Sequence, residues 1–136
     1  MSAPWKLIAA PANRDPRGVL SVLEQSPRGP SLLPFTPARI MWMYDVPVGM
    51  RRGEHAHREQ HQLFICVAGV LEVLLDDGTR QETVVLDRPH LALHVPPLVW
   101  GEQVIRAPGT AYVLLASGPF DPQEYIKTRD AWKALL

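Results

Sequence analysis

The prolines of this sequence set the strongest limit on its fold. Eight of the 14 prolines precede Val48, none lies between Val48 and Arg88, and six follow. A proline inside a helix removes a backbone donor and clashes with the preceding turn, so we expect no long helix in the first third of the chain. Short extended segments joined by proline turns are predicted there instead. The proline-free stretch can form an uninterrupted hydrogen-bonded sheet.

Short apolar segments separated by turn signals make up most of the remaining chain. Asp76-Asp77-Gly78 is a strong hairpin signal, and Pro108-Gly109 predicts a second turn. Many short strands at near-regular spacing predict an all-β sandwich or barrel, in a single domain over residues 1–136. The expected strands are residues 19–23, 38–46, 62–67, 70–75, 80–86, 91–95, 100–106 and 110–117, of which 38–46 and 62–67 are expected to be buried.

Only the C-terminal segment has a helical pattern. Asp121 is a typical N-cap residue, Pro122 suits the first helical position, and Glu124 follows the cap by three residues. Aromatic residues then recur at helical spacing, including Tyr125 and Trp132. We expect one short amphipathic C-terminal α-helix that lies against the barrel.

Charge and cysteine content exclude several classes of protein. Fourteen Lys and Arg balance 14 Asp and Glu, so no basic surplus favours nucleic acid. The single Cys66 excludes an internal disulfide and a cysteine-based zinc site. No apolar run approaches the ~18 residues of a membrane-spanning helix, and Pro4 and Pro11 interrupt any signal-like N-terminus. We therefore expect a soluble cytoplasmic protein that binds neither nucleic acid nor membrane.

The densest group of reactive side chains runs from Gly49 to Gln62 and contains His55 and His57. Alternate residues of a strand face the same way, so the two imidazoles should project together, into the barrel or into solvent. Inside a barrel they could bind a metal or transfer protons near neutral pH. The alternative is a pair of surface histidines on a polar strand. The nearby Arg52, Gln62 and aromatic strands favour the interior.

The spacing around this pair resembles the first motif of the cupin family. The matching positions are Gly49, His55, His57, Gln62 and Gly69. The cupin motif has a metal-binding glutamate where this chain has Gln62, and the second cupin motif has a histidine near Trp100-Gly101. A neutral amide is a poor replacement for an anionic ligand. The resemblance implies a single cupin jelly-roll β-barrel, here without a metal or another cofactor.

Most of the chain also resembles the nucleotide-sugar 3,4-ketoisomerases, which are cupin enzymes acting on dTDP-4-keto-6-deoxyglucose. The shared segments are Arg52-Gly53-Glu54-His55-Ala56-His57-Arg58 with Gln62, Leu75-Asp76-Asp77-Gly78, Asp15-Pro16-Arg17-Gly18-Val19-Leu20 with Glu24, Pro34-Phe35 with Arg39 and Tyr44, Trp100-Gly101-Glu102, Ala116-Ser117, and Asp121 with Tyr125-Ile126. The chain departs from the family pattern at Val70, Leu91 and Gln103. None of these departures removes a histidine of the pair.

This resemblance implies an isomerase that moves a ketone between C4 and C3 of a dTDP-linked deoxysugar through an enediol or enediolate. His55 and His57 would be the proton-transfer pair, with His57 the preferred base, and Tyr44 would donate to the sugar oxygens. The candidate substrate-binding residues are Arg17, Arg39, Arg52, Gln62, Trp100 and Glu102. Guanidinium groups suit the diphosphate, and Trp100 could stack on the base or the sugar. For each of these residues except the histidines, a purely structural or solvated role remains an alternative.

The partner implied by the resemblance is a dTDP-linked keto-deoxysugar, and the implied assembly is a homodimer that exchanges N-terminal strands. The proline-rich N-terminal third could form the exchanged arm, since an exposed edge strand invites pairing with a second chain. Two other functions are compatible with the sequence. One is a nucleotide-sugar 3,5-epimerase, which needs a histidine paired with a buried aspartate. The other is a non-enzymatic small-ligand or metal-binding cupin.

Overall fold

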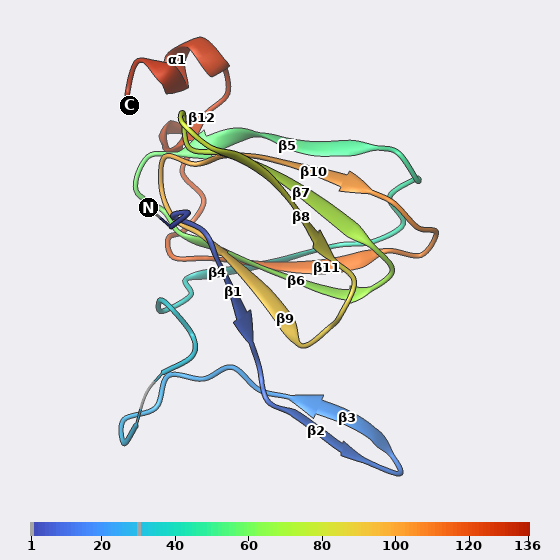
Figure 1. The fold of residues 1–136 in the computed structure, drawn as a ribbon. Helices are drawn as coiled ribbons and strands as arrows, with labels where there is room; N and C mark the ends of the chain where they lie inside the picture. The colour runs from blue at the N-terminus through green and yellow to red at the C-terminus, as the bar shows by residue number, and fades with distance from the viewer. Residues whose placement is uncertain (1, 30) are drawn as a thin grey trace.

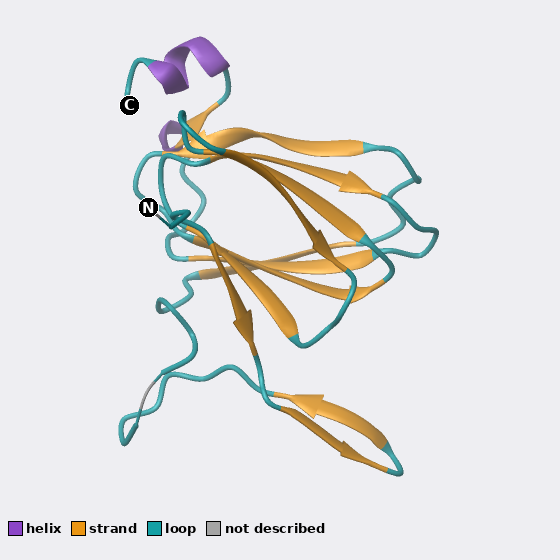
Figure 2. Cartoon of the chain, viewed as in Figure 1, coloured by secondary structure: helices purple, strands orange, loops and turns teal. Residues whose placement is uncertain are grey.

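Two antiparallel sheets of five strands each face one another across an apolar core (Figure 1). The computed structural model describes residues 2–29 and 31–136. The first sheet has the order β1-β9-β6-β11-β4, the second has the order β12-β5-β10-β7-β8, and a separate hairpin pairs β2 with β3. Helix is confined to the C-terminal end (Figure 2). The chain is an all-β jelly roll, as predicted.

The strand bounds follow the alternation of apolar and polar residues. They are β1 (Lys6–Ala9), β2 (Ala12–Asp15), β3 (Gly18–Ser21), β4 (Arg39–Met43), β5 (Arg51–His57), β6 (Gln62–Ala68), β7 (Leu71–Asp76), β8 (Gln81–Leu86), β9 (Leu91–Val95), β10 (Trp100–Ile105), β11 (Ala111–Ala116) and β12 (Tyr125–Ile126). The expected strands are present with shifted ends. The sequence patterns did not predict β1, β2 and β12.

The core lies between the two sheets and is built from alternate residues of each strand. Phe64 of β6 neighbours Leu93 of β9 and Leu114 of β11, and all three side chains are buried. Leu71 and Val73 of β7 cover them from the other sheet and are fully buried. Burial of such side chains contributes about 1.5–3 kcal/mol each. The core therefore fixes which face of each strand turns toward the interior.

The edge strand β4 is only partly buried, whereas the sequence predicted a buried strand over residues 38–46. Arg39, Met41 and Met43 turn toward the interior, whereas Ile40 and Trp42 are 55% and 64% exposed. The reason is the period of two along a strand, because a sheet that covers the core with one face must expose alternate residues on the other.

The predicted hairpin between β7 and β8 is confirmed at Asp76-Asp77-Gly78. The Asp76 carboxylate accepts a hydrogen bond from the Gly78 N–H at 2.8 Å. Asp77 accepts from the N–H groups of Thr79 and Arg80. Gly78 has a φ of +98°, a conformation that favours glycine. The two aspartates therefore close the turn that the sequence predicted.

The single C-terminal helix expected after Asp121 is wrong in its extent. Asp121 does cap a 3₁₀ turn, Pro122–Glu124, but the next two residues form β12, which pairs with β5. A new cap, Thr128, then begins the short helix α1 (Arg129–Lys133). Cross-strand hydrogen bonds to β5 compete with helix formation and stop the first turn from propagating. Of Tyr125 and Trp132, only Trp132 lies in a helix, and its side chain is fully buried.

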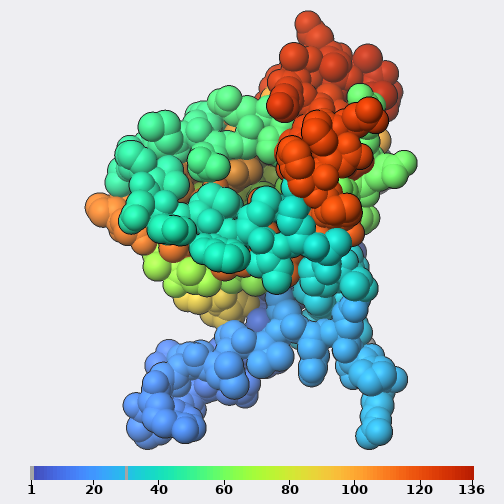
Figure 3. Space-filling model, turned by 180° about the vertical axis from the view of Figure 1, so that it is seen from behind, coloured from blue at the N-terminus to red at the C-terminus, as the bar shows by residue number. Residues whose placement is uncertain are grey.

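The β2–β3 hairpin projects away from the two sheets (Figure 1), and all eight of its residues are exposed. Figure 3 shows the N-terminal segments, in blue, extending from the body of the molecule. A two-stranded hairpin is at best marginally stable alone, so this arm is expected to need a partner surface. Within the described residues, no helix is both long and apolar enough to cross a membrane.

Candidate active site

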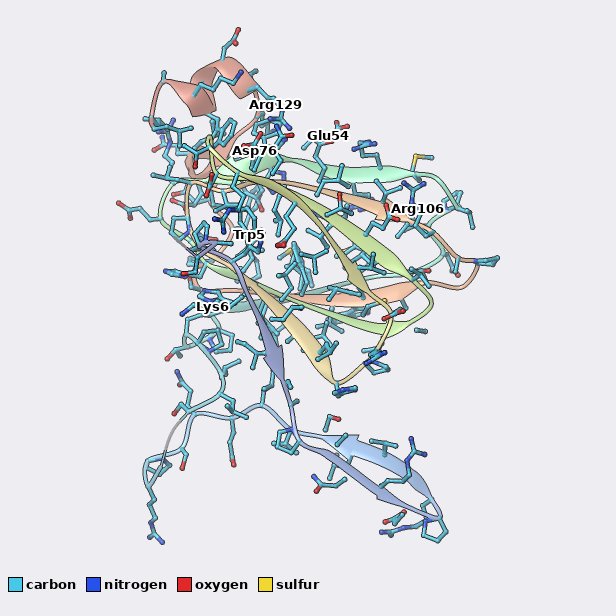
Figure 4. The ribbon with its side chains drawn as sticks, in the orientation of Figure 1. Trp5, Lys6, Glu54, Asp76, Arg106 and Arg129 are labelled. Carbon is cyan, nitrogen blue, oxygen red and sulfur yellow. The ribbon has the colours of Figure 1, made fainter. Side chains whose placement is uncertain are left out.

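A bulge in β5 sets the direction of the side chains around the histidine pair. His55 lies opposite Gly101 of β10, but Gly53 lies opposite Glu102, so Glu54 is an extra residue in the ladder. Gly53 and Glu54 have φ values of +83° and +61°, and Glu54 points outward (Figure 4). Because one residue is inserted, side chains three apart along β5 share a face. Arg52 therefore faces the interior together with His55.

Gly53 is required for this bulge. A Cβ atom at this position would lie 2.6 Å from the side-chain nitrogen of Gln103, in addition to the strain of the positive φ. Gln103 lies opposite Arg52 and is buried. A side chain at position 53 would therefore collide with the neighbouring strand, a constraint that no local pattern in β5 reveals.

His55 and His57 lie together inside the jelly roll, with ring centroids 4.9 Å apart and edge to face. His57 is 4% exposed, and both of its ring nitrogens are buried without a hydrogen-bond partner. Burial, followed by the nearby His55 and Arg39, lowers the pKa of His57 to about 3. Burial also lowers the pKa of His55, against an opposing backbone hydrogen bond with Gly53. Both imidazoles are therefore neutral at pH 7, and each can accept a proton.

Tyr125 completes an aromatic cluster with the two histidines. It lies opposite His57 across the β12–β5 pair, and its ring centroid is 4.6 Å from His57 and 4.9 Å from His55. Phe120 lies 5.9 Å from the Tyr125 ring and extends the cluster. The sequence patterns assigned Tyr125 to a helix and gave it no site role. The Tyr125-Ile126 pair quoted for the family resemblance was the one signal that pointed to it.

Arg39 reaches the histidine pair from the opposite sheet. It shares the inner face of that sheet with Gln62, through the pairing of both with Ala116. One terminal nitrogen of Arg39 donates to the Gln60 side-chain oxygen at 3.3 Å, and its Nε is buried without a partner. Its guanidinium lies 5.7 Å from the centre of the Phe120 ring. Arg39 is thus held beside His57 with hydrogen-bonding capacity to spare.

Gln62 is 8% exposed, and no hydrogen bond of its side-chain amide is formed within the described residues. Its neighbour Gln60 has a different role, because its amide donates to the Pro119 carbonyl at 2.9 Å while it accepts from Arg39. Gln60 therefore fixes Arg39. Gln62 offers a free donor and a free acceptor on the inner face.

Arg52 is exposed at the mouth of the interior, with Tyr112 beneath it. Burial raises the pKa of the Tyr112 phenol, and the charge of Arg52 and a hydrogen bond with it oppose this rise. The Tyr112 hydroxyl also lies 3.3 Å from the Gln103 side-chain oxygen, to which it donates. Tyr112 and Gln103 thus support Arg52 from the interior. The structure brings His55, His57, Arg39, Arg52 and Gln62 onto the facing inner surfaces of the two sheets.

The other four predicted site residues lie elsewhere in this chain. Tyr44 follows β4 and is 62% exposed. Trp100 and Glu102 belong to the face of β10 opposite to Gly101, and so turn away from the histidines. Arg17 is at the tip of the β2–β3 hairpin, where it forms an exposed ion pair with Asp15 at 2.6 Å.

Trp100 and Glu102 take part in a cluster that fastens the C-terminal helix to the outside of the second sheet. The Arg129 guanidinium lies 5.0 Å from the centre of the Trp100 ring and forms an ion pair with Glu102 at 3.2 Å. It forms a second ion pair with Asp76 at 2.8 Å, and Figure 4 shows these two residues side by side. Burial alone would raise the pKa of Glu102, but hydrogen bonds from Trp100, Arg51 and Arg129 lower it. These contacts give both residues a structural role in the chain itself.

The metal centre typical of cupins does not fit this donor set. Within residues 2–29 and 31–136, no three His, Cys, Asp or Glu side chains group as metal ligands would. The inner face around His55 and His57 presents the neutral Gln62 and, at the position opposite His55, Gly101. Two imidazoles and an amide lack the third imidazole and the carboxylate of the cupin centre.

A jelly roll with a buried histidine pair between its sheets defines the chain as a cupin. The family described as FdtA (WxcM-like, C-terminal) matches residues 4–136, and the chain belongs to this family. It is 33% identical to the TDP-4-oxo-6-deoxy-alpha-D-glucose-3,4-oxoisomerase of Aneurinibacillus thermoaerophilus over 122 residues, which are 90% of this chain and 85% of that relative.

Solved structures of 3,4-ketoisomerases share the fold over nearly the whole chain. The enzyme from Helicobacter canadensis is 30% identical and superposes with a TM-score of 0.90 over 98% of each chain. The sugar 3,4-ketoisomerase QdtA of Thermoanaerobacterium thermosaccharolyticum, in complex with TDP, is 27% identical with a TM-score of 0.91. Its match covers 99% of this chain and 96% of that one.

Proposed function

We propose that this protein is an isomerase that interconverts a dTDP-4-keto-6-deoxyhexose and its 3-keto isomer, in the biosynthesis of an unusual deoxysugar. The observation that carries the proposal is the buried histidine pair, in which both nitrogens of His57 are unpartnered. Its support is the 33% identity, over 90% of the chain, to a protein named for this reaction.

The reaction needs one base, one proton donor and stabilisation of a developing oxyanion. A neutral imidazole of the pair, with His57 preferred, removes the proton from C3, and the electrons of the C3–H bond form a C3–C4 double bond while the C4 oxygen becomes an enediolate oxygen. The C3 hydroxyl then gives its proton to solvent or the second imidazole, the C4 oxygen takes up a proton, and delivery of a proton to C4 leaves a ketone at C3 and a hydroxyl at C4. No electrons enter or leave the sugar, so no redox partner is required.

Cations on the inner face suit the diphosphate and the sugar oxygens of this substrate. Arg52 lies at the exposed end of β5, where its guanidinium can bind phosphate oxygens. Arg39 and Gln62 are beside the reacting end, with unpartnered hydrogen-bonding groups. Arg52 would thus bind the phosphates, and Arg39 and Gln62 would orient the sugar.

The proposal includes a homodimer in which the β2–β3 hairpin of each chain packs on the other subunit. A groove of about 950 Å³ lies between this hairpin and the outer face of the first sheet. Apolar side chains dominate its lining, among them Val19, Leu20, Ile40, Val67, Val113 and Leu115. A second copy of this chain would bury these side chains and give the exposed hairpin the sheet contacts that it lacks. A monomeric mass from light scattering at micromolar concentration would contradict this arrangement.

The direct test of the function is isomerisation in deuterated water. Purified protein is incubated with dTDP-4-keto-6-deoxyglucose, and the products are followed by NMR. We expect a 3-keto sugar nucleotide with deuterium at the carbon that receives the returned proton. A substrate recovered without isomerisation and without deuterium would overturn the proposal.

Experiments on the same purified protein distinguish the two alternative functions. A 3,5-epimerase would incorporate deuterium at C3 and C5 while keeping the ketone at C4, and it needs a histidine–aspartate pair. His57 has no such partner within the described residues. A metal-binding cupin would carry stoichiometric Fe, Mn or Zn, which elemental analysis detects. A cytoplasmic location is proposed with the enzyme function and is tested by cell fractionation.

A further inference from the structure

Tyr125 is the one tyrosine that contacts the histidine pair. The chain has three tyrosines. Tyr44 is 62% exposed after β4, and the Tyr112 hydroxyl is engaged with Gln103 and Arg52. Tyr125 contacts both imidazoles, and no hydrogen bond of its hydroxyl is formed within the described residues. It therefore combines a position at the site with a free donor.

The backbone around Tyr125 is fastened on both sides, so its ring has a defined place. On the N-terminal side, the Glu124 carboxylate accepts hydrogen bonds from the N–H groups of Glu59 and Gln60, at 2.7 and 2.6 Å. The Glu124 carbonyl accepts from the Arg58 N–H at 3.0 Å. On the C-terminal side, Ile126 is buried against Ala56 and Trp132. These contacts hold β12 against the strand that carries the histidines.

The C-terminal segment places Tyr125 next to the histidine pair. Figure 3 shows the C-terminal segment, in orange-red, lying against the strand region that carries the histidines, in green, beside the interior. Tyr125 is half-buried, so its ring packs on the histidines while part of it remains accessible. A group bound at the His57 ring would lie close to Tyr125, because the two ring centroids are 4.6 Å apart.

We propose that Tyr125 is a catalytic residue of this isomerase and that its hydroxyl donates a hydrogen bond to the sugar oxygen that becomes negatively charged. This inference rests on the proposed function and deepens it. When a histidine removes the C3 proton, the electron pair moves into the C3–C4 bond and the charge moves onto the C4 oxygen. A phenol that donates to this oxygen stabilises the charge without being consumed, because it keeps its proton throughout.

The test compares Tyr125→Phe with Thr83→Val, which removes a hydroxyl at an exposed position of β8, away from the histidines. The Phe side chain keeps the ring packed on His55 and His57, so only the donor is lost. We expect kcat to fall about 10²-fold to 10³-fold for Tyr125→Phe, as for loss of one oxyanion donor, with KM within about twofold of wild type. Thr83→Val should leave both constants unchanged. TDP affinity, measured by calorimetry, should be the same in all three proteins.

A structural role for Tyr125 gives a different result. If the ring alone matters, Tyr125→Ala loses activity and Tyr125→Phe recovers it fully, which overturns the proposal. A fall in TDP affinity that accounts for the whole loss would also overturn it, since the hydroxyl would then bind rather than stabilise. A wild-type protein that forms no 3-keto sugar would overturn the proposed function itself. An active wild type with an unaffected Tyr125→Phe variant overturns only the role of Tyr125.

Discussion

At the scale of single residues, His57 is distinguished because its ring is buried while its two nitrogens have no hydrogen-bond partner. Buried polar atoms in folded proteins nearly always have hydrogen-bond partners, and a group left without one costs about 1–3 kcal/mol. His57 has two such nitrogens. A cost of this kind is retained where it serves a function, because the unpartnered nitrogens are free to meet a substrate.

The His57→Asn variant is therefore expected to fold and to lose isomerisation. Loss of a positioned acid–base group typically lowers the rate by about 10²–10⁴-fold. The matched control is His61→Asn, because His61 is half-buried outside the site and its ring pairs with His94. We expect the control to keep wild-type turnover. Wild-type turnover in His57→Asn, measured by the NMR assay above, would remove His57 from the mechanism.

The lowered pKa of His57 also predicts how stability depends on pH. Its pKa is about 3 in the folded protein and near 6.5 in an unfolded chain, so between these values the unfolded state binds more protons. The contribution of neutral His57 is complete above pH 6.5 and is lost as the pH falls toward 3, by at most about 1.4 kcal/mol per pH unit.

The measurement is urea unfolding of wild type and His57→Gln between pH 7 and pH 4.5, at one protein concentration. We expect the free energy of unfolding to fall more steeply with acid in the wild type than in the variant. Parallel curves for the two proteins would show that His57 is not held neutral by the fold.

Some residues of the site could be predicted from the sequence and others could not, for physical reasons. His55 and His57 could be predicted to project together, because two positions along a strand return to the same face. The inward direction of Arg52 could not, since it depends on the bulge in the pairing of β5 with β10. Sequence alone also does not say which of Gly101 and Glu102 faces inward, because that is decided by the register of β10.

At the scale of elements, helix α1 and the strand of the histidines are joined through one strained residue. Leu98 has a φ of +65°. Its N–H donates to the His57 carbonyl at 2.8 Å, and its own carbonyl accepts from the Trp132 indole at 2.8 Å. A side chain rarely adopts this conformation unless the surroundings hold it. The indole therefore helps to fix the backbone of His57 from outside the sheet.

Trp132→Phe tests this connection, because it keeps an aromatic ring in the buried site and removes the indole donor. We expect a loss of about 1–3 kcal/mol in the free energy of unfolding, as for an unsatisfied buried carbonyl, and a lower kcat. Trp42→Phe is the control, since Trp42 is 64% exposed on the outer face. Unfolding curves and turnover of Trp132→Phe that match those of the control would contradict the connection.

The elements themselves were predictable where local signals agree with the tertiary contacts. The β7–β8 hairpin followed from Asp76-Asp77-Gly78 because the turn is closed by its own side chains. The C-terminal segment did not follow, because Tyr125 and Ile126 satisfy both helical spacing and strand pairing. The choice between them is made by β5, which lies about 70 residues earlier in the chain and supplies the backbone partners.

At the scale of the whole molecule, the projecting hairpin carries one of the predicted site residues away from the two sheets that hold the histidines. Arg17 is carried on the projecting hairpin, in an exposed ion pair with Asp15 that contributes little. In the proposed dimer, the hairpin of one subunit packs on the other. The predicted role of Arg17 in substrate binding and the predicted exchange of N-terminal strands then become one hypothesis, in which Arg17 serves the site of its partner.

Mixed dimers test this hypothesis. Arg17→Ala and His57→Asn, each expected to be nearly inactive alone, are co-expressed with different affinity tags, and the doubly tagged dimer is isolated. If Arg17 acts on the partner's site, one of the two sites in this dimer combines an intact Arg17 with an intact His57, and about half of the wild-type activity should return. If Arg17 acts within its own subunit, each site retains one defect and the dimer stays inactive.

The control dimer carries both substitutions in one subunit and none in the other, and the two models predict the opposite activities for it. Arg17 acting between subunits leaves each of its sites with one defect, whereas Arg17 acting within a subunit leaves one site intact. Activity in the control dimer but not in the mixed dimer would therefore place Arg17 in the site of its own chain.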